Sequence, residues 1–149
     1  MDRGSQLISA LWDMMNKKRA LDLRGLKSLS GDLNPSELRC IDFIGRHDSV
    51  NATRLAEAFY LTTGAASKLT KKLLTKGLVT RYQKLENKKE IYFRLTEEGR
   101  GIFQVQDALL REFAQRDEPV FRSLTEEQFQ TILDFTRSYI SHLDRLSRR

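Results

Sequence analysis

Nine lysine and arginine residues gather in one short stretch of this 149-residue chain. They are Lys68, Lys71, Lys72, Lys76, Arg81, Lys84, Lys88, Lys89 and Arg94. Only Glu86 and Glu90 oppose them there, so the stretch carries a net charge of +7, whereas the whole chain carries +6 and its remainder −1. Clustered cations attract a polyanion, because each phosphate contact releases condensed counterions. The stretch is therefore a candidate polyanion-binding surface, and a merely solvated basic face is the alternative.

Two short helices joined by a tight turn would position the first of these cations. One helix begins at Asn51, and the next begins at Thr62 or Thr63 and ends at Gly77, which suits a left-handed C-cap. The apolar residues of the second helix recur at helical spacing and define its buried side: Ala66, Leu69 and Leu73. Its lysines then point outward, which is the arrangement of a helix-turn-helix.

A basic hairpin is expected directly after these helices. Residues 79–84 and 90–95 are strand-like, and the polar tip at 85–89 joins them. A helix-turn-helix followed by a basic hairpin is a winged helix. In that fold the second helix fits the major groove of duplex DNA, and the hairpin reaches the adjacent minor groove or the backbone.

Five motifs of the chain resemble the multiple-antibiotic-resistance regulator (MarR) family: Leu33–Leu38 (LNPSEL), Leu55–Glu57 (LAE), Ser67–Leu69 (SKL), Lys76–Val79 (KGLV) and Leu95–Arg100 (LTEEGR). The likeness covers about Leu33 to Arg100 in motif detail, and long flanking helices match the family's layout. The resemblance implies a homodimeric transcriptional regulator that binds a pseudo-palindromic operator in double-stranded DNA. Such a protein most simply represses by blocking promoter access, and terminal helices would form its dimer interface.

DNA-contacting residues are expected on the outward face of the second helix and on the hairpin. They are Thr62, Thr63, Gly64, Ala65, Ser67, Lys68, Lys71, Arg81, Lys84, Lys88 and Lys89. The resembled family usually carries an Asp-x-Arg pattern in its wing, and the equivalent positions here hold Asn87 and Lys89. A lysine lacks the guanidinium fork, so this wing is expected to act more on phosphates than in the groove. A solvated hairpin tip is the alternative for Lys88 and Lys89.

The expected fold class is mainly α with a small β-hairpin wing, in which long dimerisation helices flank the winged helix. The winged helix covers 34–100, and the dimerisation helices cover 5–21 and 100–147, within a single domain of 149 residues. Residues 22–32 are interrupted by Gly and Ser and indicate a connector. Pro119 is expected to break one C-terminal helix, and a capping box at Thr125 opens the next. The assigned dimer-interface residues are Leu7, Leu11, Ile140, Leu143 and Leu146.

An apolar pocket is a further expectation. The resembled family often binds small aromatic effectors between its dimerisation helices and its winged helix, and the candidate residues here are Trp12, Met15, Phe43 and Tyr60. The same side chains are more often plain core. The single cysteine, Cys40, is interpreted as an inert buried thiol in preference to an oxidant sensor.

Several function classes find no support in the sequence. His47 and His142 lack the spacing of a metal site, and no catalytic constellation or cofactor motif appears, so neither an enzyme nor a metal or cofactor site is expected. No signal pattern and no apolar run of ~18 residues appears, which favours a cytoplasmic protein without a membrane segment. The alternative function is a winged-helix module whose basic wing binds an acidic protein.

Overall fold

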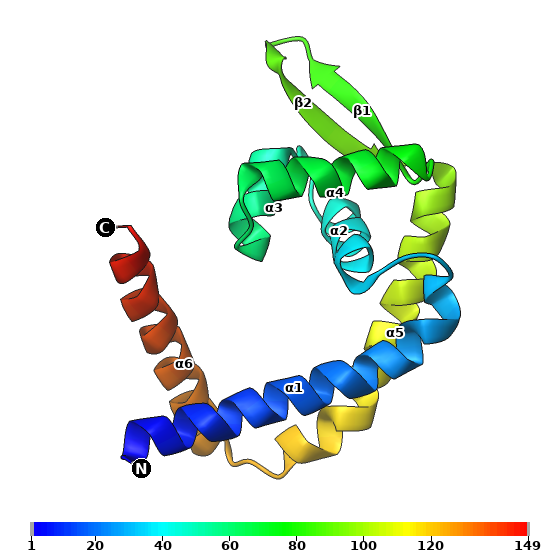
Figure 1. Cartoon of the computed structure of the whole chain (residues 1–149). Coiled ribbons are helices and arrows are strands. Elements are labelled where there is room, and N and C mark those ends of the chain that lie inside the picture. Colours follow the sequence, from blue (N-terminus) through cyan, green and yellow to red (C-terminus); the bar gives the residue numbers. More distant parts are fainter. Residues whose placement is uncertain (1, 149) are drawn as a thin grey trace. The chain divides into compact units, whose positions relative to one another are not determined.

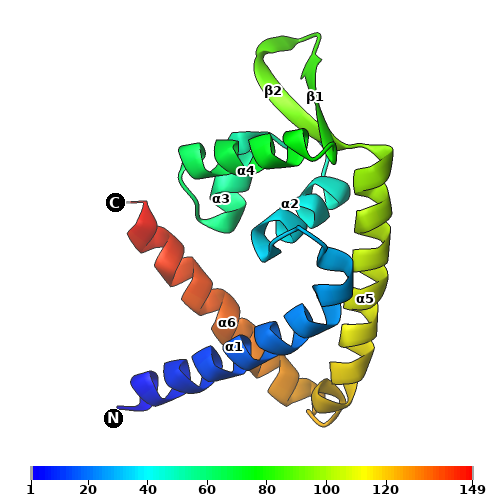
Figure 2. The same ribbon diagram turned by 45° about the vertical axis from the view of Figure 1, so that its right-hand side comes forward.

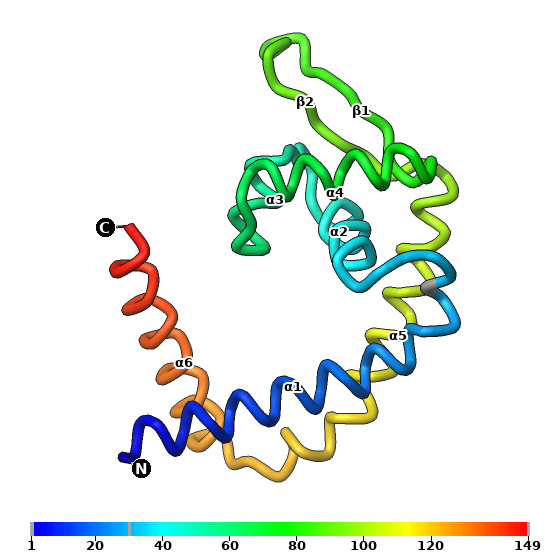
Figure 3. Tube along the Cα trace, viewed as in Figure 1, coloured from blue at the N-terminus to red at the C-terminus, as the bar shows by residue number. Residues whose placement is uncertain are grey.

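The computed structural model describes residues 2–148, except the side chain of Ser30. Along that range the elements follow in the order α1 (Arg3–Ser30), α2 (Pro35–Arg46), α3 (Ala52–Phe59), α4 (Thr63–Thr75), β1 (Val79–Lys84), β2 (Asn87–Leu95), α5 (Glu97–Arg122) and α6 (Glu126–Ser147). Figure 3 traces the same path. Two compact units make up the chain, one ending at Leu110 and the other beginning at Arg111. The single domain stays a prediction.

Local capping explains where the helices of the winged part begin. Asn34 closes a capping box with Glu37 at the start of α2, with a proline in the first turn, as the sequence predicts. Asn51 and Thr62 cap α3 and α4 in the same way, by accepting a hydrogen bond from the backbone three residues on. The helices bury the apolar side chains expected from helical spacing: Leu38, Ile41, Ile44, Leu55, Ala66, Leu69 and Leu73.

The end of α4 has the predicted left-handed glycine. Gly77 has φ 72°, the amide of Leu78 donates to the Leu73 carbonyl at 3.0 Å, and the amide of Gly77 donates to the Leu74 carbonyl at 3.0 Å. These two bonds are those of a Schellman motif, which satisfies carbonyls that the helix end would otherwise leave unpaired. The chain therefore turns sharply from α4 into β1.

β1 and β2 form an antiparallel hairpin that projects beyond α4 (Figures 1 and 2). Val79 pairs with Leu95 and Arg81 with Phe93, and the register shifts between Tyr82 and Lys84. The predicted first strand is confirmed. The second begins at Asn87, earlier than residue 90, because Leu85 and Glu86 alone make the turn. The five-residue tip predicted for 85–89 is therefore wrong.

Two predicted helix boundaries are also wrong. The expected connector at 22–32 is helical as far as Ser30, where Gly31 with φ 50° ends α1. Leu26 is buried in this last part of α1, and such packing outweighs the roughly 1 kcal/mol helix penalty of one glycine. Pro119 does not break α5, which continues to Arg122, because a proline removes a single amide donor and only one short turn follows it.

The terminal helices expose most of their apolar side chains in the single chain. α6 has no buried residue, although it begins at the predicted capping box of Thr125 and Gln128. The dimer-interface candidates Leu7, Leu11, Ile140, Leu143 and Leu146 are between 36% and 51% exposed. From residue 2 to residue 148, no helix combines the length and the apolarity needed to cross a membrane.

Candidate nucleic-acid interface

α4 turns one face inward and leaves the other free. Its buried side holds Ala66, Leu69, Thr70 and Leu73. Every helix residue predicted to face DNA is exposed: Thr62, Thr63, Gly64, Ala65, Ser67, Lys68 and Lys71. Thr62 also caps the helix, since its Oγ1 accepts a hydrogen bond from the Ala65 amide at 3.1 Å. A Cβ added at Gly64 would meet nothing within 4 Å, so the start of α4 is open to a ligand that approaches closely.

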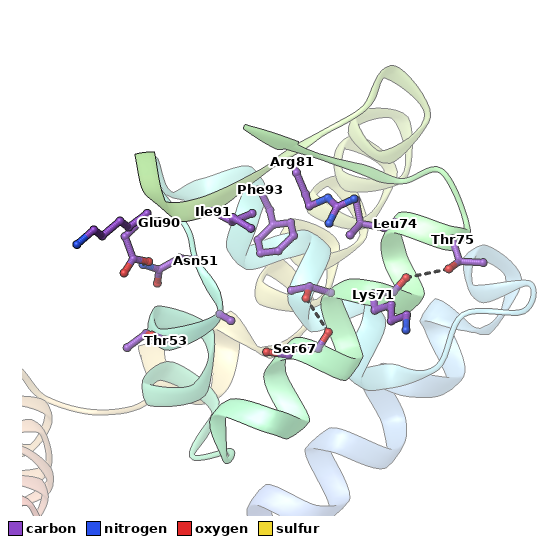
Figure 4. Close-up of a pocket in the computed structure, with 13 residues that line it drawn as sticks. Asn51, Thr53, Ser67, Lys71, Leu74, Thr75, Arg81, Glu90, Ile91 and Phe93 are labelled. Carbon is purple, nitrogen blue, oxygen red and sulfur yellow. Dashed lines mark hydrogen bonds between the residues drawn. The ribbon is translucent and has the colours of Figure 1, made fainter. Parts of the chain in front are cut away.

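A cleft of about 750 Å³ lies between α4, the hairpin and the start of α3 (Figure 4). Its apolar lining comes from Leu74, Ile91 and Phe93. Its cationic lining comes from Lys71 on α4, Arg81 on β1 and Lys89 on β2. The remaining lining residues are Asn51, Ala52, Thr53, Ser67, Thr70, Thr75 and Glu90. The fold thus brings Ser67, Lys71, Arg81 and Lys89, all predicted from the sequence, to one concave surface.

The sequence did not identify the contribution of α3 to this cleft. Asn51 and Thr53 line it beside Glu90, and the Asn51 amide nitrogen donates to a Glu90 carboxylate oxygen at 3.2 Å. Asn51 and Glu90 are 39 positions apart in the chain. The amide of Phe93 also donates to the Val50 carbonyl at 2.8 Å, which ties the start of α3 to β2.

The other face of the hairpin carries a ladder of stacked aromatic and cationic side chains. The rings of Tyr82 and Tyr92 are 5.5 Å apart. The Arg94 guanidinium lies 3.9 Å from the Tyr82 ring centre, and the Lys84 ammonium lies 4.5 Å from that of Tyr92. Lys84 Nζ also donates to Ser49 Oγ. Lys84, predicted to contact DNA, is therefore packed against the hairpin and does not line the cleft.

The tip of the hairpin is held by local hydrogen bonds. Asn87 Oδ1 accepts a hydrogen bond from the Lys89 amide at 3.2 Å, and the side chain of Gln83 donates to the Lys88 carbonyl at 2.9 Å. Asparagine favours such local bonds to the backbone near turns. Lys88 and Lys89 are exposed and lie in the first residues of β2, directly after the turn.

The structure does not gather the candidate effector residues around one cavity of the single chain. Phe43 is half-buried and stacks on His47 with ring centres 4.1 Å apart. Trp12, Met15 and Tyr60 are 72%, 56% and 90% exposed. The effector pocket therefore stays a prediction.

Cys40 is fully buried, with 0% exposure. Burial, assisted by the negative charge of Glu37, raises the pKa of the Cys40 thiol to about 12. A thiol that stays protonated is a poor nucleophile, which supports the interpretation of an inert core residue. Across residues 2–148, no group of three or more His, Cys, Asp or Glu side chains could hold a metal ion.

Comparison with known proteins agrees with this architecture. The MarR family model matches residues 33–91. The HTH-type transcriptional regulator PchR of Bacillus subtilis (strain 168) is 30% identical over 111 residues, which cover 74% of this chain and 66% of PchR. The matched part is thus slightly less than two thirds of that relative's own length.

Solved structures share the fold over nearly the whole chain. Streptococcus pneumoniae FabT, solved in complex with DNA, matches with a TM-score of 0.73 at 20% identity, covering 95% of this chain and 98% of FabT. Staphylococcus aureus MarR, solved with salicylate and kanamycin, matches with a TM-score of 0.76 at 14% identity, covering 95% and 93%. At these identities the likeness shows the fold. Together, these findings identify a winged helix-turn-helix fold in which residues 33–91 match the MarR family.

Proposed function

We propose that this protein binds a specific sequence of double-stranded DNA and regulates transcription as a homodimer, most simply by repression. The observation that carries the proposal is the cleft in which Lys71, Arg81 and Lys89 meet beside the exposed face of α4. Cations from three separate elements line one concave surface there, as expected of a binding site for the phosphate backbone of DNA. The naming of PchR as a transcriptional regulator and the DNA complex of FabT support the same function.

In this proposal α4 enters the major groove. Gly64 and Ala65 carry little or no side chain, so the start of the helix can approach the base edges closely. Ser67, Lys68 and Lys71 are exposed along the same helix and can donate hydrogen bonds to phosphates or bases. α4 has no arginine, so the commonest guanine contact, a bidentate arginine, does not come from this helix.

The cleft would then hold the backbone of one DNA strand. Lys71 stands on the α4 side, and Arg81 stands on the hairpin side. Deoxyribose would rest against Leu74, Ile91 and Phe93. Lys88 and Lys89, at the start of β2, would reach the next phosphates or the adjacent minor groove. The hairpin thereby fixes the register of α4 on the duplex.

A second copy of the chain would cover the exposed apolar rows of α1 and α6. Two-fold symmetry suits a pseudo-palindrome, whose half-sites lie about 34 Å apart. A small aromatic effector would bind near Trp12, Met15, Phe43 and Tyr60 and shift the equilibrium between DNA-bound and free protein. The salicylate complex of S. aureus MarR supports this part of the proposal.

The test is a titration of the purified full chain on two duplexes of equal length, one selected from genomic fragments by the protein and one of random sequence. The logarithm of the binding constant should fall linearly with the logarithm of salt concentration, with a slope of about −0.9 per phosphate contact. The selected duplex should bind at least ~1,000-fold more tightly than the random one. Equal affinity for both duplexes would favour the alternative of an acidic protein partner.

A further inference from the structure

Glu90 places a carboxylate in the wall of the cationic cleft. It lines the cleft with Lys71, Arg81 and Lys89, and it follows Lys89 directly in β2. Figure 4 shows the side chains of Glu90 and Asn51 next to each other at the α3 end of the cleft. A carboxylate is an unusual neighbour for a phosphate, because like charges at short range repel.

The negative charge of Glu90 is not cancelled by an ion pair. Its hydrogen-bond partner is Asn51, and over residues 2–148 no lysine or arginine forms a salt bridge with it. Lys89 forms no ion pair with Glu90, although the two are adjacent in sequence. The cleft therefore contains an exposed and uncompensated carboxylate beside its cations.

Asn51 fixes where that carboxylate stands. Its Oδ1 accepts a hydrogen bond from the Arg54 amide at 2.8 Å, as the N-cap of α3. Since this bond orients the side-chain amide, its nitrogen is directed at Glu90, to which it donates at 3.2 Å. The Glu90 side chain is thereby tethered to the wall of the cleft, and a bound strand could displace it only by breaking this hydrogen bond.

We infer that Glu90 weakens binding of the DNA backbone on any sequence, by repelling the phosphates that Lys71, Arg81 and Lys89 attract. This inference rests on the proposed function. Sequence-independent affinity for DNA comes almost entirely from electrostatic contacts with phosphates. A fixed negative charge in the cationic cleft therefore lowers this sequence-independent affinity. Binding then depends more heavily on the base contacts of α4, and the protein spends less time on unrelated DNA.

The test compares wild type with Glu90→Gln, Glu90→Asp and Glu86→Gln on the selected and the random duplex. Glu90→Gln keeps the size and an acceptor for Asn51 but removes the charge, whereas Glu90→Asp keeps the charge. Glu86→Gln is the matched control, because Glu86 is the hairpin's other carboxylate and does not line the cleft. Glu90→Gln should tighten binding to both duplexes about three- to tenfold at low salt, and the gain should shrink as salt screens it. Glu90→Asp should resemble wild type.

Three results would overturn the inference while leaving DNA binding intact. Unchanged affinity of Glu90→Gln would show that the carboxylate does not face the backbone. Weaker binding to the selected duplex alone would make Glu90 a reader of a base amino group. An equal gain in Glu86→Gln would assign the effect to the overall charge of the hairpin. If wild type binds neither duplex, the proposed function itself fails.

Discussion

Lys76 Nζ lies 2.7 Å from Glu37 Oε2, so an ion pair joins the end of α4 to the start of α2. The Glu37 side chain is only 3% exposed, and Lys76 also donates to the Asp32 carbonyl at 3.0 Å. The hydrogen bond that Lys76 donates to the Glu37 carboxylate, together with the negative charge of that group, raises the pKa of Lys76. One of the nine cations counted in the sequence therefore ties the end of α4 to the start of α2 and is engaged within the protein.

Replacing Glu37 with Ala should lower the free energy of unfolding by about 2 kcal/mol, because it removes the buried partner of Lys76 and one half of the capping box. Urea denaturation followed by circular dichroism measures the change. Glu57→Ala is the control, since Glu57 is an exposed residue of α3. Equal stability of the two variants would show that the Glu37–Lys76 pair contributes nothing to the fold.

Replacing Gly64 with Ala should weaken binding to the selected duplex by about tenfold or more without harming the fold. The added methyl group meets nothing in the protein within 4 Å, and alanine favours a helix, but the methyl would stand between α4 and the bases. Gly101→Ala on α5 is the matched control, because it also points into open space. Unchanged DNA affinity in Gly64→Ala would mean that the start of α4 does not approach the bases closely.

The Cys40 thiol should react with a disulfide reagent only when the protein unfolds. Burial raises the pKa of the thiol from 9.0 to about 12. The contribution of the protonated thiol to the free energy of unfolding is therefore fully present below pH 9 and is lost as the pH rises toward 12. Labelling followed at pH 8, with and without urea, measures the reaction. Rapid stoichiometric labelling of the folded protein would contradict the buried position and reopen the oxidant-sensor interpretation.

The sequence predicts those parts of the fold that local chemistry determines. Asn34, Asn51, Thr62 and Thr125 are capping residues whose side chains bond to the next turn of the chain, so the helix starts could be predicted well. Gly77 similarly determined the end of α4. The outward face of α4 followed from the spacing of its buried residues.

Features that depend on contacts between residues far apart in the chain could not be predicted from the sequence. The pairing of Asn51 with Glu90 depends on the register between the start of α3 and β2, which no local pattern encodes. Gln106 is 4% exposed and donates to the Leu38 carbonyl at 3.2 Å, although glutamine is usually on the surface. α1 extends past its predicted end because Leu26 is buried, and that also is a tertiary effect.

Replacing Ile140 and Leu143 together with Asp should give monomers or insoluble protein. Both side chains are about half exposed on α6, at 51% and 47%, and burial of that exposed half against a second copy would contribute roughly 1 kcal/mol for each. Sedimentation equilibrium measures the assembly, and Ser141→Asp on the polar side of the same helix is the control. A double variant that remains dimeric would place the interface elsewhere.

The central claim, that α4 and the hairpin bind DNA together, is tested most directly by titrating the selected duplex with wild type, Lys71→Glu, Lys89→Glu and Lys17→Glu at several salt concentrations. Lys71 and Lys89 line the cleft, whereas Lys17 pairs with the exposed Asp13 on α1 at 3.1 Å. Each cleft variant should bind at least about tenfold more weakly and lose about 0.9 from the salt slope, and Lys17→Glu should bind like wild type. If all three variants behave alike, the cleft is not the DNA-binding surface.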